Sequence, residues 1–564
     1  MVGSVSRTSS PTSVALWGLV AAVFLWVAPG CDSDQNQKSG ATAKAKGAEK
    51  AQKNQKPKPD TFRYALADDP ETFDTAKMSG APEGRVAFNV FEGLLTPAQT
   101  TKGAESTEDL VRPGVAKDWS VSDDGTTYTF NLRKDAKWSN GEPVTAEDFV
   151  YAWKRVLTPG FDADYVQLLW VLKNGQAYSE GEIDDFSKVG VEAVDAQTLK
   201  VELSHPTPYF LELVAFYTFF PQPKDVIEEH GDNWTDSKHI VSNGPYLLEN
   251  YTTQQHIKLK KNPDYWNADE VSIPKAELRI IKDRNAVVNA FQAGDLHWTG
   301  AGLPIAQVSS LVMRDDYVRE PMLGTYYYRI NVTDEDSPLA NPKVRKALSL
   351  AIDRRSIVKL TMKGLYEVPK GFVPSNLSGY ESTAETEFNI SKAKKLLKEA
   401  GYPNGEGFPK TAVLYNTDKN HKVVAANIQN MWSKNLGIEV ELVNTEWKTY
   451  LERVDNLNYE IARAGWIGDY NDPMTFLNLW VTGNGNNDTG WSNEEYDSLI
   501  QEAKRESDRE KRKKLLQKAE AILLEEGPVI PIYEYSSNML LDERIQGFKP
   551  HNRNIHLIKD LSFK

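Results

Sequence analysis

Residues 110–150 read LVRPGVAKDWSVSDDGTTYTFNLRKDAKWSNGEPVTAEDFV, and they predict a strand followed closely by a helix. Residues 127–132 (TYTFNL) alternate polar and apolar side chains, which is typical of a half-buried strand. Residues 124–125 (DG) before them are a tight-turn signal. Residues 145–148 (TAED) resemble a capping box with Asp in the last place. The helix that follows would turn Phe149, Trp153 and Val156 inward.

Strands and helices also alternate further along the chain. Apolar spacing predicts helices that begin near Pro342 and near Ser391, and the second should end at Gly401, a C′ glycine. A long amphipathic helix is expected over residues 510–526. Residues 528–533 (PVIPIY) predict a buried strand with prolines at its start or at a sheet edge. The fold class is therefore α/β with several lobes.

Composition and charge limit the classes of function. The chain has 564 residues, and at about 100–200 residues per domain this length predicts two to four lobes. Its only cysteine is Cys31, so packing rather than an intrachain disulfide must stabilise it. Residues 61–564 carry a net charge of −17, within a chain total of −13. An acidic body argues against nucleic acid as the partner, because phosphate binding needs a basic face.

The first 60 residues predict export and anchoring. Residues 1–30 resemble a secretory signal with a 15-residue apolar run, shorter than the about 20 residues of a spanning helix. The run ends in Ala28-Pro29-Gly30-Cys31, which is similar to a bacterial lipobox although Leu is usual at the first place. We expect Cys31 to be the lipidation site, with an ordinary signal peptide as the alternative. Residues 31–60 predict a flexible, positively charged tether.

Sequence motifs of catalysis are missing. The chain contains no phosphate-binding loop, no His-Glu-x-x-His metal motif and no Gly-x-Ser-x-Gly elbow. The glycines at 483 and 485 are not followed by a helical pattern, so a dinucleotide site is not expected. We therefore expect no catalytic residue, no metal and no cofactor.

Several motifs resemble the peptide and nickel solute-binding family of ABC importers. The first is the stretch 110–150 itself. The others follow in the order of that family: residues 242–246 (SNGPY), 262–266 (NPDYW) and 344–354 (VRKALSLAIDR). Residues 414–417 (LYNT), 446–450 (EWKTY) and 462–473 (ARAGWIGDYNDP) are most similar to the oligopeptide-binding branch. The resemblance extends over residues 61–564.

The resemblance implies a fold like that of type II periplasmic binding proteins, with two large lobes joined by a hinge and an extra smaller lobe. Lobe I would comprise residues 61–82, 223–321 and 537–564. Lobe II would be residues 83–222 and lobe III residues 322–536. The ligand would lie between lobes I and III, which close around it.

The resemblance also implies a function. It predicts an extracytoplasmic lipoprotein that binds oligopeptides of about two to five residues and delivers them to ABC permease subunits. The chain would be a monomer, held by its lipid on the outer face of the cytoplasmic membrane or in the periplasm. A murein tripeptide binder and a peptide-sensing receptor without transport are alternatives. An extracytoplasmic peptidase is a weaker one, since no activated nucleophile or metal motif is present.

The positions that match the family's peptide-contacting residues fall mainly in residues 421–535. Asp469 would pair with the ligand ammonium, while Gly465 and Ile467 would offer main-chain groups to an extended peptide. The residues implied to line side-chain pockets are Trp447, Trp466 and Tyr535, the last with core packing as its alternative. Two further contacts would come from Tyr165 of lobe II and from Asn486, or Asn487 beside it.

The carboxylate end of the ligand would meet Arg463 and His421. A third cation is expected after the segment that begins at Trp447, but Val454 occupies that position and Arg453 is its neighbour. This difference makes cell-wall peptide the main alternative ligand. Asp472 precedes a proline, which favours an extended backbone and a structural role for it.

Overall fold

The computed structural model describes residues 59–564, except residues 105, 301, 378 and 507. The predicted signal, Cys31 and all but the end of the tether lie outside the described residues. Within the described ranges, none of the helices has both the length and the apolar character that a membrane crossing requires.

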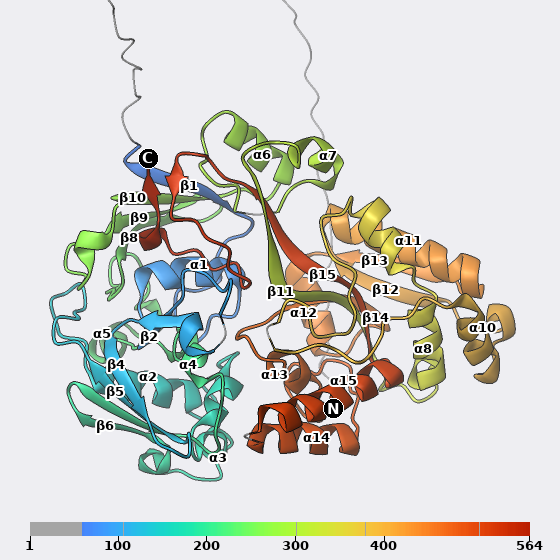
Figure 1. The fold of residues 1–564 in the computed structure, drawn as a ribbon, viewed down its shortest axis with the longest axis horizontal. Helices are drawn as coiled ribbons and strands as arrows, with labels where there is room; N and C mark the ends of the chain where they lie inside the picture. Colours follow the sequence, from blue (N-terminus) through green and yellow to red (C-terminus); the bar gives the residue numbers. More distant parts are fainter. Residues whose placement is uncertain (1–58, 105, 301, 378, 507) are drawn as a thin grey trace, which may run out of the picture. The chain divides into compact units, whose positions relative to one another are not determined.

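Three sheets of four or five strands organise the described residues (Figure 1). The first has the order β1-β10-β9-β8 and contains β1 (Thr61–Leu66), β8 (Tyr246–Thr252), β9 (His256–Lys261) and β10 (Lys275–Ile280). The second has the order β4-β5-β7-β6 and contains β4 (Ala116–Val121), β5 (Thr127–Leu132), β6 (Val191–Asp195) and β7 (Thr198–Glu202). The third has the order β13-β12-β14-β11-β15 and contains β11 (Tyr317–Ile330), β12 (Thr411–Asn416), β13 (Val440–Thr445), β14 (Ile461–Ile467) and β15 (Val529–Leu540).

Helices and short strand pairs complete the fold. The α-helices are α1 (Ala81–Val90), α2 (Ala146–Leu157), α3 (Gly175–Ser179), α4 (Phe210–Leu213), α5 (Lys224–His230), α6 (Arg284–Gln292), α7 (Val308–Leu311), α8 (Pro342–Leu350), α9 (Arg354–Ser356), α10 (Ile390–Glu399), α11 (Lys419–Leu436), α12 (Trp447–Asp455), α13 (Met474–Leu477), α14 (Glu494–Arg505) and α15 (Arg509–Glu526). The two-stranded pairs are β2 (Leu95–Pro97) with β3 (Val111–Pro113), and β16 (Ile545–Gln546) with β17 (Ser562–Phe563).

The local predictions for residues 110–150 are confirmed. In β5, Tyr128, Phe130 and Leu132 are buried and their neighbours are not, as the alternation predicted. The backbone N–H of Thr145 donates to Asp148 Oδ2 at 2.7 Å, which completes the capping box at the start of α2. The predicted helices correspond to α8, α10 and α15.

The predicted strand at 528–533 is longer than expected. It is β15, and it runs on to Leu540 as an edge strand of the third sheet. The predicted strand ended at 533, yet Ser536, Ser537 and Asn538 beyond it are buried. They pair with β11, so the antiparallel ladder rather than apolar periodicity keeps this segment extended.

Strands β11 and β15 lie side by side as the longest strands of the described residues (Figure 1). Their ladder is irregular between residues 321 and 325. The predicted boundaries between lobes I and III, at 321/322 and 536/537, fall inside these two strands. The division into lobes stays a prediction, and its hinge would consist of continuous extended chain.

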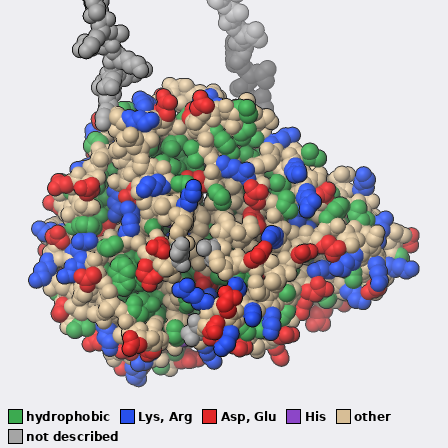
Figure 2. All heavy atoms as spheres, viewed as in Figure 1, with side chains coloured by type: hydrophobic (Ala, Val, Ile, Leu, Met, Phe, Trp, Pro, Cys, Tyr) green, Lys and Arg blue, Asp and Glu red, His purple; other side chains and the backbone are tan. Residues whose placement is uncertain are grey.

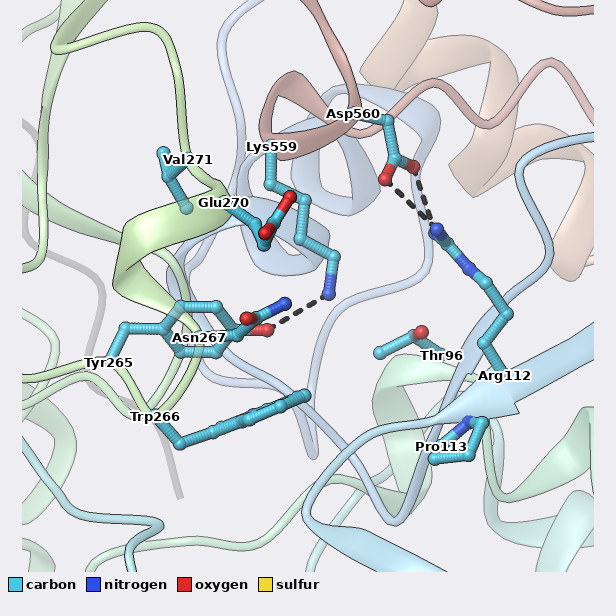
Figure 3. Close-up of a pocket in the computed structure, with 10 residues that line it drawn as sticks. All are labelled: Thr96, Arg112, Pro113, Tyr265, Trp266, Asn267, Glu270, Val271, Lys559 and Asp560. Atoms are coloured by element: carbon cyan, nitrogen blue, oxygen red, sulfur yellow. Dashed lines mark hydrogen bonds and ion pairs between the residues drawn. The ribbon is translucent and has the colours of Figure 1, made fainter.

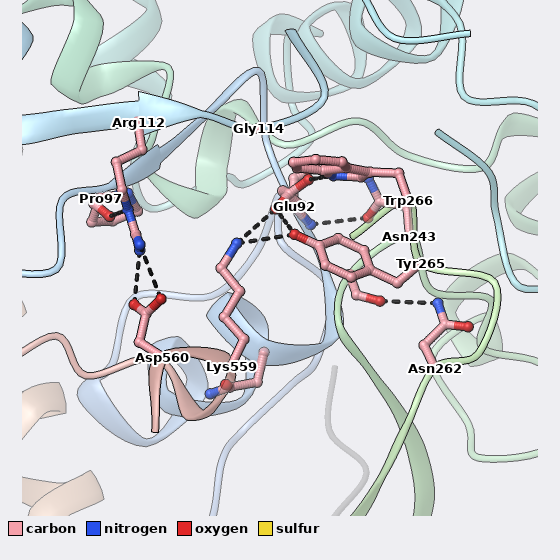
Figure 4. A network of polar contacts seen from close by, with 12 residues as sticks. Glu92, Pro97, Arg112, Gly114, Asn243, Asn262, Tyr265, Trp266, Lys559 and Asp560 are labelled. Atoms are coloured by element: carbon pink, nitrogen blue, oxygen red, sulfur yellow. Dashed lines mark hydrogen bonds and ion pairs between the residues drawn. The ribbon is translucent and has the colours of Figure 1, made fainter. Parts of the chain in front are cut away.

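The motifs at 110–150, 242–246 and 262–266 meet in one polar network (Figure 4). At its centre is the buried Glu92, whose carboxylate accepts hydrogen bonds from Tyr265 Oη (2.5 Å), Trp266 Nε1 (2.6 Å) and Lys559 Nζ (2.9 Å). Asn243 accepts from the backbone N–H of Glu92 and donates to its carbonyl. These motifs therefore fasten segments that are far apart in sequence.

A cavity of about 180 Å³ adjoins this network (Figure 3). Arg112 closes one side with a bidentate ion pair to Asp560, at 2.9 and 2.8 Å. Lys559 donates to Tyr265 on the other side at 3.0 Å. Because Arg112 is paired with Asp560 and Lys559 with Glu92, we regard the cavity as part of a structural joint.

Acidic and basic side chains are interspersed over the face of the molecule in Figure 2. That face has no continuous basic surface of the kind that binds a phosphate backbone.

Candidate functional site

The second half of β14 has a strand on one side only. Its residues from Arg463 to Ile467 pair with β11. On the other side, the pairing with β12 ends at Leu414 opposite Ala462. Among the described residues, no strand pairs with positions 463–467 on that side, so the third sheet has an open edge within it.

The backbone groups that face the open edge belong to alternate residues. Tyr450 Oη donates to the carbonyl oxygen of Arg463, so this carbonyl points away from β11. Because backbone groups alternate in direction along a strand, those of Gly465 and Ile467 point the same way. The two residues whose main chain was predicted to contact a peptide therefore face the open edge.

Gly465 is also required by its neighbour across the sheet. A Cβ atom at this position would lie 2.5 Å from Tyr535 Oη and 3.3 Å from two carbons of the same ring. The structure thus gives this glycine a packing role besides the main-chain contact with a peptide expected from the resemblance. Tyr535 itself is only partly buried and lies edge-on to Tyr326, Tyr366 and Tyr533.

A cation lies at one end of the open edge. Arg463 Nε is buried and has no hydrogen-bond partner among the described residues, and none of their ion pairs includes Arg463. Its guanidinium lies over the ring of Tyr326, 5.3 Å from the centroid. A partly buried guanidinium with no carboxylate beside it is suited to an anion.

His421 lies beside the same tyrosine, with 5.6 Å between the ring centroids. Its Nδ1 is buried and has no partner among the described residues. Burial, together with the nearby charges of Arg463 and Arg284, lowers the pKa of His421 well below 6.5. The imidazole is therefore neutral at pH 7 and can donate or accept a hydrogen bond at this end of the edge.

A carboxylate lies beyond the other end of the edge. Asp469 follows β14 and receives a hydrogen bond from Tyr165 Oη at 3.4 Å. Burial raises its pKa from 3.8 to about 7, against the opposing effects of Arg553 and of this hydrogen bond. The side chains predicted to meet the two termini of a peptide, Arg463 and Asp469, thus flank the open edge.

The three predicted lobes meet beside Asp469, at the buried carboxylate of Glu212. Arg553 lies 3.1 Å from it, and Asn471 donates to it through its backbone N–H (3.1 Å) and its side-chain amide (2.7 Å). Arg553 also donates to the carbonyl of Asp469. Glu212 and Arg553 were not predicted, because each is far in sequence from Asp469 and neither belongs to a recognisable motif.

The other predicted residues are Trp447 at the start of α12, Trp466 in β14, and Asn486 or Asn487 in the loop before α14. Trp447 is 45% exposed and stacks on Tyr450 at 5.5 Å. Trp466 is partly buried, and its Nε1 has no partner in the described chain. Asn487 Nδ2 donates to the carbonyl of Trp491, and Asn487 Oδ1 accepts a hydrogen bond from Thr489 Oγ1. Asn486 makes no such side-chain bond among the described residues, which favours Asn486 over Asn487 for contact with a ligand.

The third cation does not come from the predicted segment. Val454 is 2% exposed in an apolar cluster with Leu414 and Tyr459. Arg453 Nε donates to the carbonyl of Asn458 on the surface, at 3.1 Å. The structural role expected for Asp472 is borne out, because Arg512 holds it in a bidentate ion pair at 2.6 and 2.8 Å and both side chains are buried.

Together these features define a class of protein. The open edge of β14 offers main-chain groups between two oppositely charged ends, and the two long paired strands β11 and β15 pass through the predicted boundary between lobes I and III. This is the arrangement of a solute-binding protein whose lobes close on a ligand. The chain belongs to the bacterial extracellular solute-binding proteins, family 5, whose model matches residues 111–488.

The predicted family and fold class are confirmed by similar proteins. The oligopeptide-binding protein OppA of Bacillus subtilis is 39% identical over 503 residues, which cover 86% of this chain and 90% of that protein. The structure of Haemophilus influenzae OppA with the peptide RPPGFSPFR has a TM-score of 0.82 and 34% identity, covering 89% of this chain and 99% of that one.

The arrangement of the lobes can be compared with two structures of one relative. The Escherichia coli murein tripeptide binding protein MppA has a TM-score of 0.82 and 32% identity, covering 89% of this chain and 98% of that one. Its unliganded open form, with coverage of 89% and 97%, has a TM-score of only 0.67. The described residues therefore depart from that open form, in keeping with the contacts of Glu212.

Proposed function

We propose that this protein is the extracytoplasmic substrate-binding component of an ABC importer, and that it captures oligopeptides by adding them to the open edge of β14. It binds without catalysis and delivers its ligand to permease subunits. Gly465 and Ile467 hydrogen-bond to the peptide main chain, Asp469 holds the ammonium, and Arg463 with His421 holds the carboxylate.

The observation that carries the proposal is the open edge between the partly buried cation of Arg463, which has no carboxylate partner in the described chain, and the partly buried carboxylate of Asp469. A strand edge accepts an extended peptide of any sequence, because the contacts are main-chain hydrogen bonds. The four residue steps from Arg463 to Ile467 correspond to about 13 Å of extended chain, and Asp469 lies two residues beyond the end of the strand. A peptide of three to five residues spans roughly 10–18 Å, which leaves room for both charged side chains.

The aromatic residues around the edge suit a site with little side-chain selectivity. Trp447, Trp466 and Tyr535 are partly exposed near β14 and would offer broad apolar surfaces to ligand side chains. Tyr165 and Asn486 would contribute from lobe II and from the loop before α14. Such surfaces bury apolar groups of many shapes, so affinity depends mainly on the termini and the backbone.

The protein acts as a lipid-anchored monomer on the outer face of the cytoplasmic membrane or in the periplasm. The lipobox-like sequence before Cys31 and the polar segment after it support this proposal. Replacing Cys31 with Ser should move the protein from the membrane fraction to the soluble extracytoplasmic fraction. Continued membrane association of that variant would rule out the anchor.

A cell-wall tripeptide is the second candidate ligand. Val454 supports this candidate, because the murein tripeptide binders that this chain resembles also lack a cation at the matching position. Titration with murein tripeptide and with trialanine would show which of these two ligands binds more tightly. Tighter binding of the murein peptide by more than tenfold would make it the preferred ligand.

The proposed function is tested by calorimetry with tetraalanine, its N-acetyl form and its C-terminal amide. The protein is first freed of co-purified peptide by unfolding and refolding. We expect each blocked form to bind at least tenfold more weakly, because a desolvated charge loses its partner. Equal affinities for all three peptides, or no binding of any, would contradict the proposal.

A further inference from the structure

Helices α6 and α11 come from different predicted lobes, and their N-terminal residues form two reciprocal ion pairs. Asp283 caps α6 and lies 3.5 Å from Lys419 Nζ, at the start of α11. Asp418 caps α11 and lies 3.4 Å from Arg284 Nη2, at the start of α6. The two pairs connect lobe I to lobe III, but their surroundings differ.

The side chain of Arg284 is more buried than that of Lys419. Its side chain is 33% exposed, whereas that of Lys419 is 84% exposed. The carboxylate that pairs with Arg284, Asp418, accepts a hydrogen bond from the backbone N–H of His421 at 3.2 Å. The guanidinium of Arg284 also contributes to lowering the pKa of His421 and opposes the rise in the pKa of Tyr366 caused by burial. Arg284 therefore lies close to the cationic end of the open edge.

The charges at this end are not balanced within the described chain. Arg463, Arg284 and Lys419 are positive, Asp418 and Asp283 are negative, and His421 is neutral. One positive charge is in excess, and Arg463 is the member without a carboxylate. Arg284 uses one N–H toward Asp418 at a long distance of 3.4 Å, which leaves most of its five donors for another acceptor.

We infer that Arg284 is the third cation of the carboxylate subsite and determines the preference for peptides with a free C-terminus. The inference rests on the proposed function, and it places the missing cation on lobe I rather than after Trp447. A ligand carboxylate between Arg463 and Arg284 is held by both lobes, so its recognition requires the closed arrangement.

The test measures the affinities of tetraalanine and tetraalanine amide for the wild type and for Arg284→Gln by calorimetry. We expect Arg284→Gln to weaken binding of the acid by about tenfold and of the amide by less than twofold. Arg284→Lys should recover part of the preference for the acid, since it restores the charge without the planar fork. Circular dichroism and the melting temperature of each variant check that it is folded.

Lys419→Gln is the matched control, because it removes the other ion pair between the same two helices. It should change both affinities by less than twofold and leave their ratio unchanged. If Arg284→Gln weakens the acid and the amide equally, Arg284 is only a contact between the lobes and the inference is wrong. A wild type that does not distinguish the two peptides would instead overturn the proposed function itself.

Discussion

The partly buried carboxylate of Asp469 should make peptide binding depend on pH. In the arrangement of this structure burial raises its pKa to about 7, so without a ligand only about 3% of Asp469 is ionised there at pH 5.5, against roughly three quarters at pH 7.5. Because only the ionised form pairs with an ammonium, affinity should fall roughly 20–30-fold between pH 7.5 and pH 5.5. Above about pH 8 the ligand's own α-amino group loses its proton, so affinity falls again.

Calorimetry with tetraalanine at several pH values measures this profile. Repeating the titrations in buffers of different ionisation enthalpy gives the number of protons released on binding near pH 6. Asp469→Asn should bind more than tenfold more weakly at pH 7.5 and lose the acidic limb of the profile. The reasoning would be refuted if the affinity changed by less than twofold from pH 5.5 to 7.5. It would also be refuted if the Asp469→Asn variant lost affinity at acidic pH in the same way as the wild type.

The same carboxylate should affect stability with the opposite dependence on pH. Its folded pKa is raised above its unfolded value, so the ionised form is disfavoured in the fold and stability falls as pH rises from about 4 through 7. At about 1.4 kcal/mol for each pH unit between the two pKa values, the loss is at most ~4 kcal/mol. Ligand-free Asp469→Asn should therefore resist urea better than the wild type at pH 8 and no better at pH 4.

Three other outcomes are expected. Arg512→Ala should lower the free energy of unfolding by about 3–5 kcal/mol, since it leaves Asp472 buried without a partner, whereas Lys513→Ala should cost less than about 1 kcal/mol in the same urea titration. Gly465→Ala should destabilise the protein by about 1–3 kcal/mol through its clash with Tyr535, and Tyr535→Phe should relieve most of that loss if the hydroxyl is its cause. Tetraalanine should reduce the radius of gyration measured by small-angle scattering. At 100 times its dissociation constant it should also stabilise the protein by about 2.7 kcal/mol. An unchanged radius of gyration and melting temperature would exclude closure.

Features set by near neighbours in sequence could be predicted. The alternation in β5 and the capping box at Thr145 depend on residues within one strand or one turn, and both are present in the structure. The resemblance added the positions of Arg463 and Asp469, which belong to one continuous segment. Their separation along β14 follows directly from the spacing of an extended chain.

Features set by distant segments could not be predicted. Glu212, Arg284 and Arg553 approach the ends of the edge from three separate parts of the chain, and nothing in their local sequence distinguishes them from surface charges. The length of β15 was missed because pairing with β11, rather than apolar periodicity, holds its polar half in place. The motifs around Arg112 and Tyr265 indicated the family, but their role in the joint at Glu92 became visible only in three dimensions.

The most direct test of the central claim is a crystal structure of the refolded protein with tetraalanine. We predict a peptide in extended conformation along the open edge of β14, hydrogen-bonded to the main chain of Gly465 and Ile467. Its ammonium should lie about 3 Å from Asp469 and its carboxylate at hydrogen-bond distance from Arg463. A peptide bound elsewhere, or one whose two ends are reversed, would contradict the account.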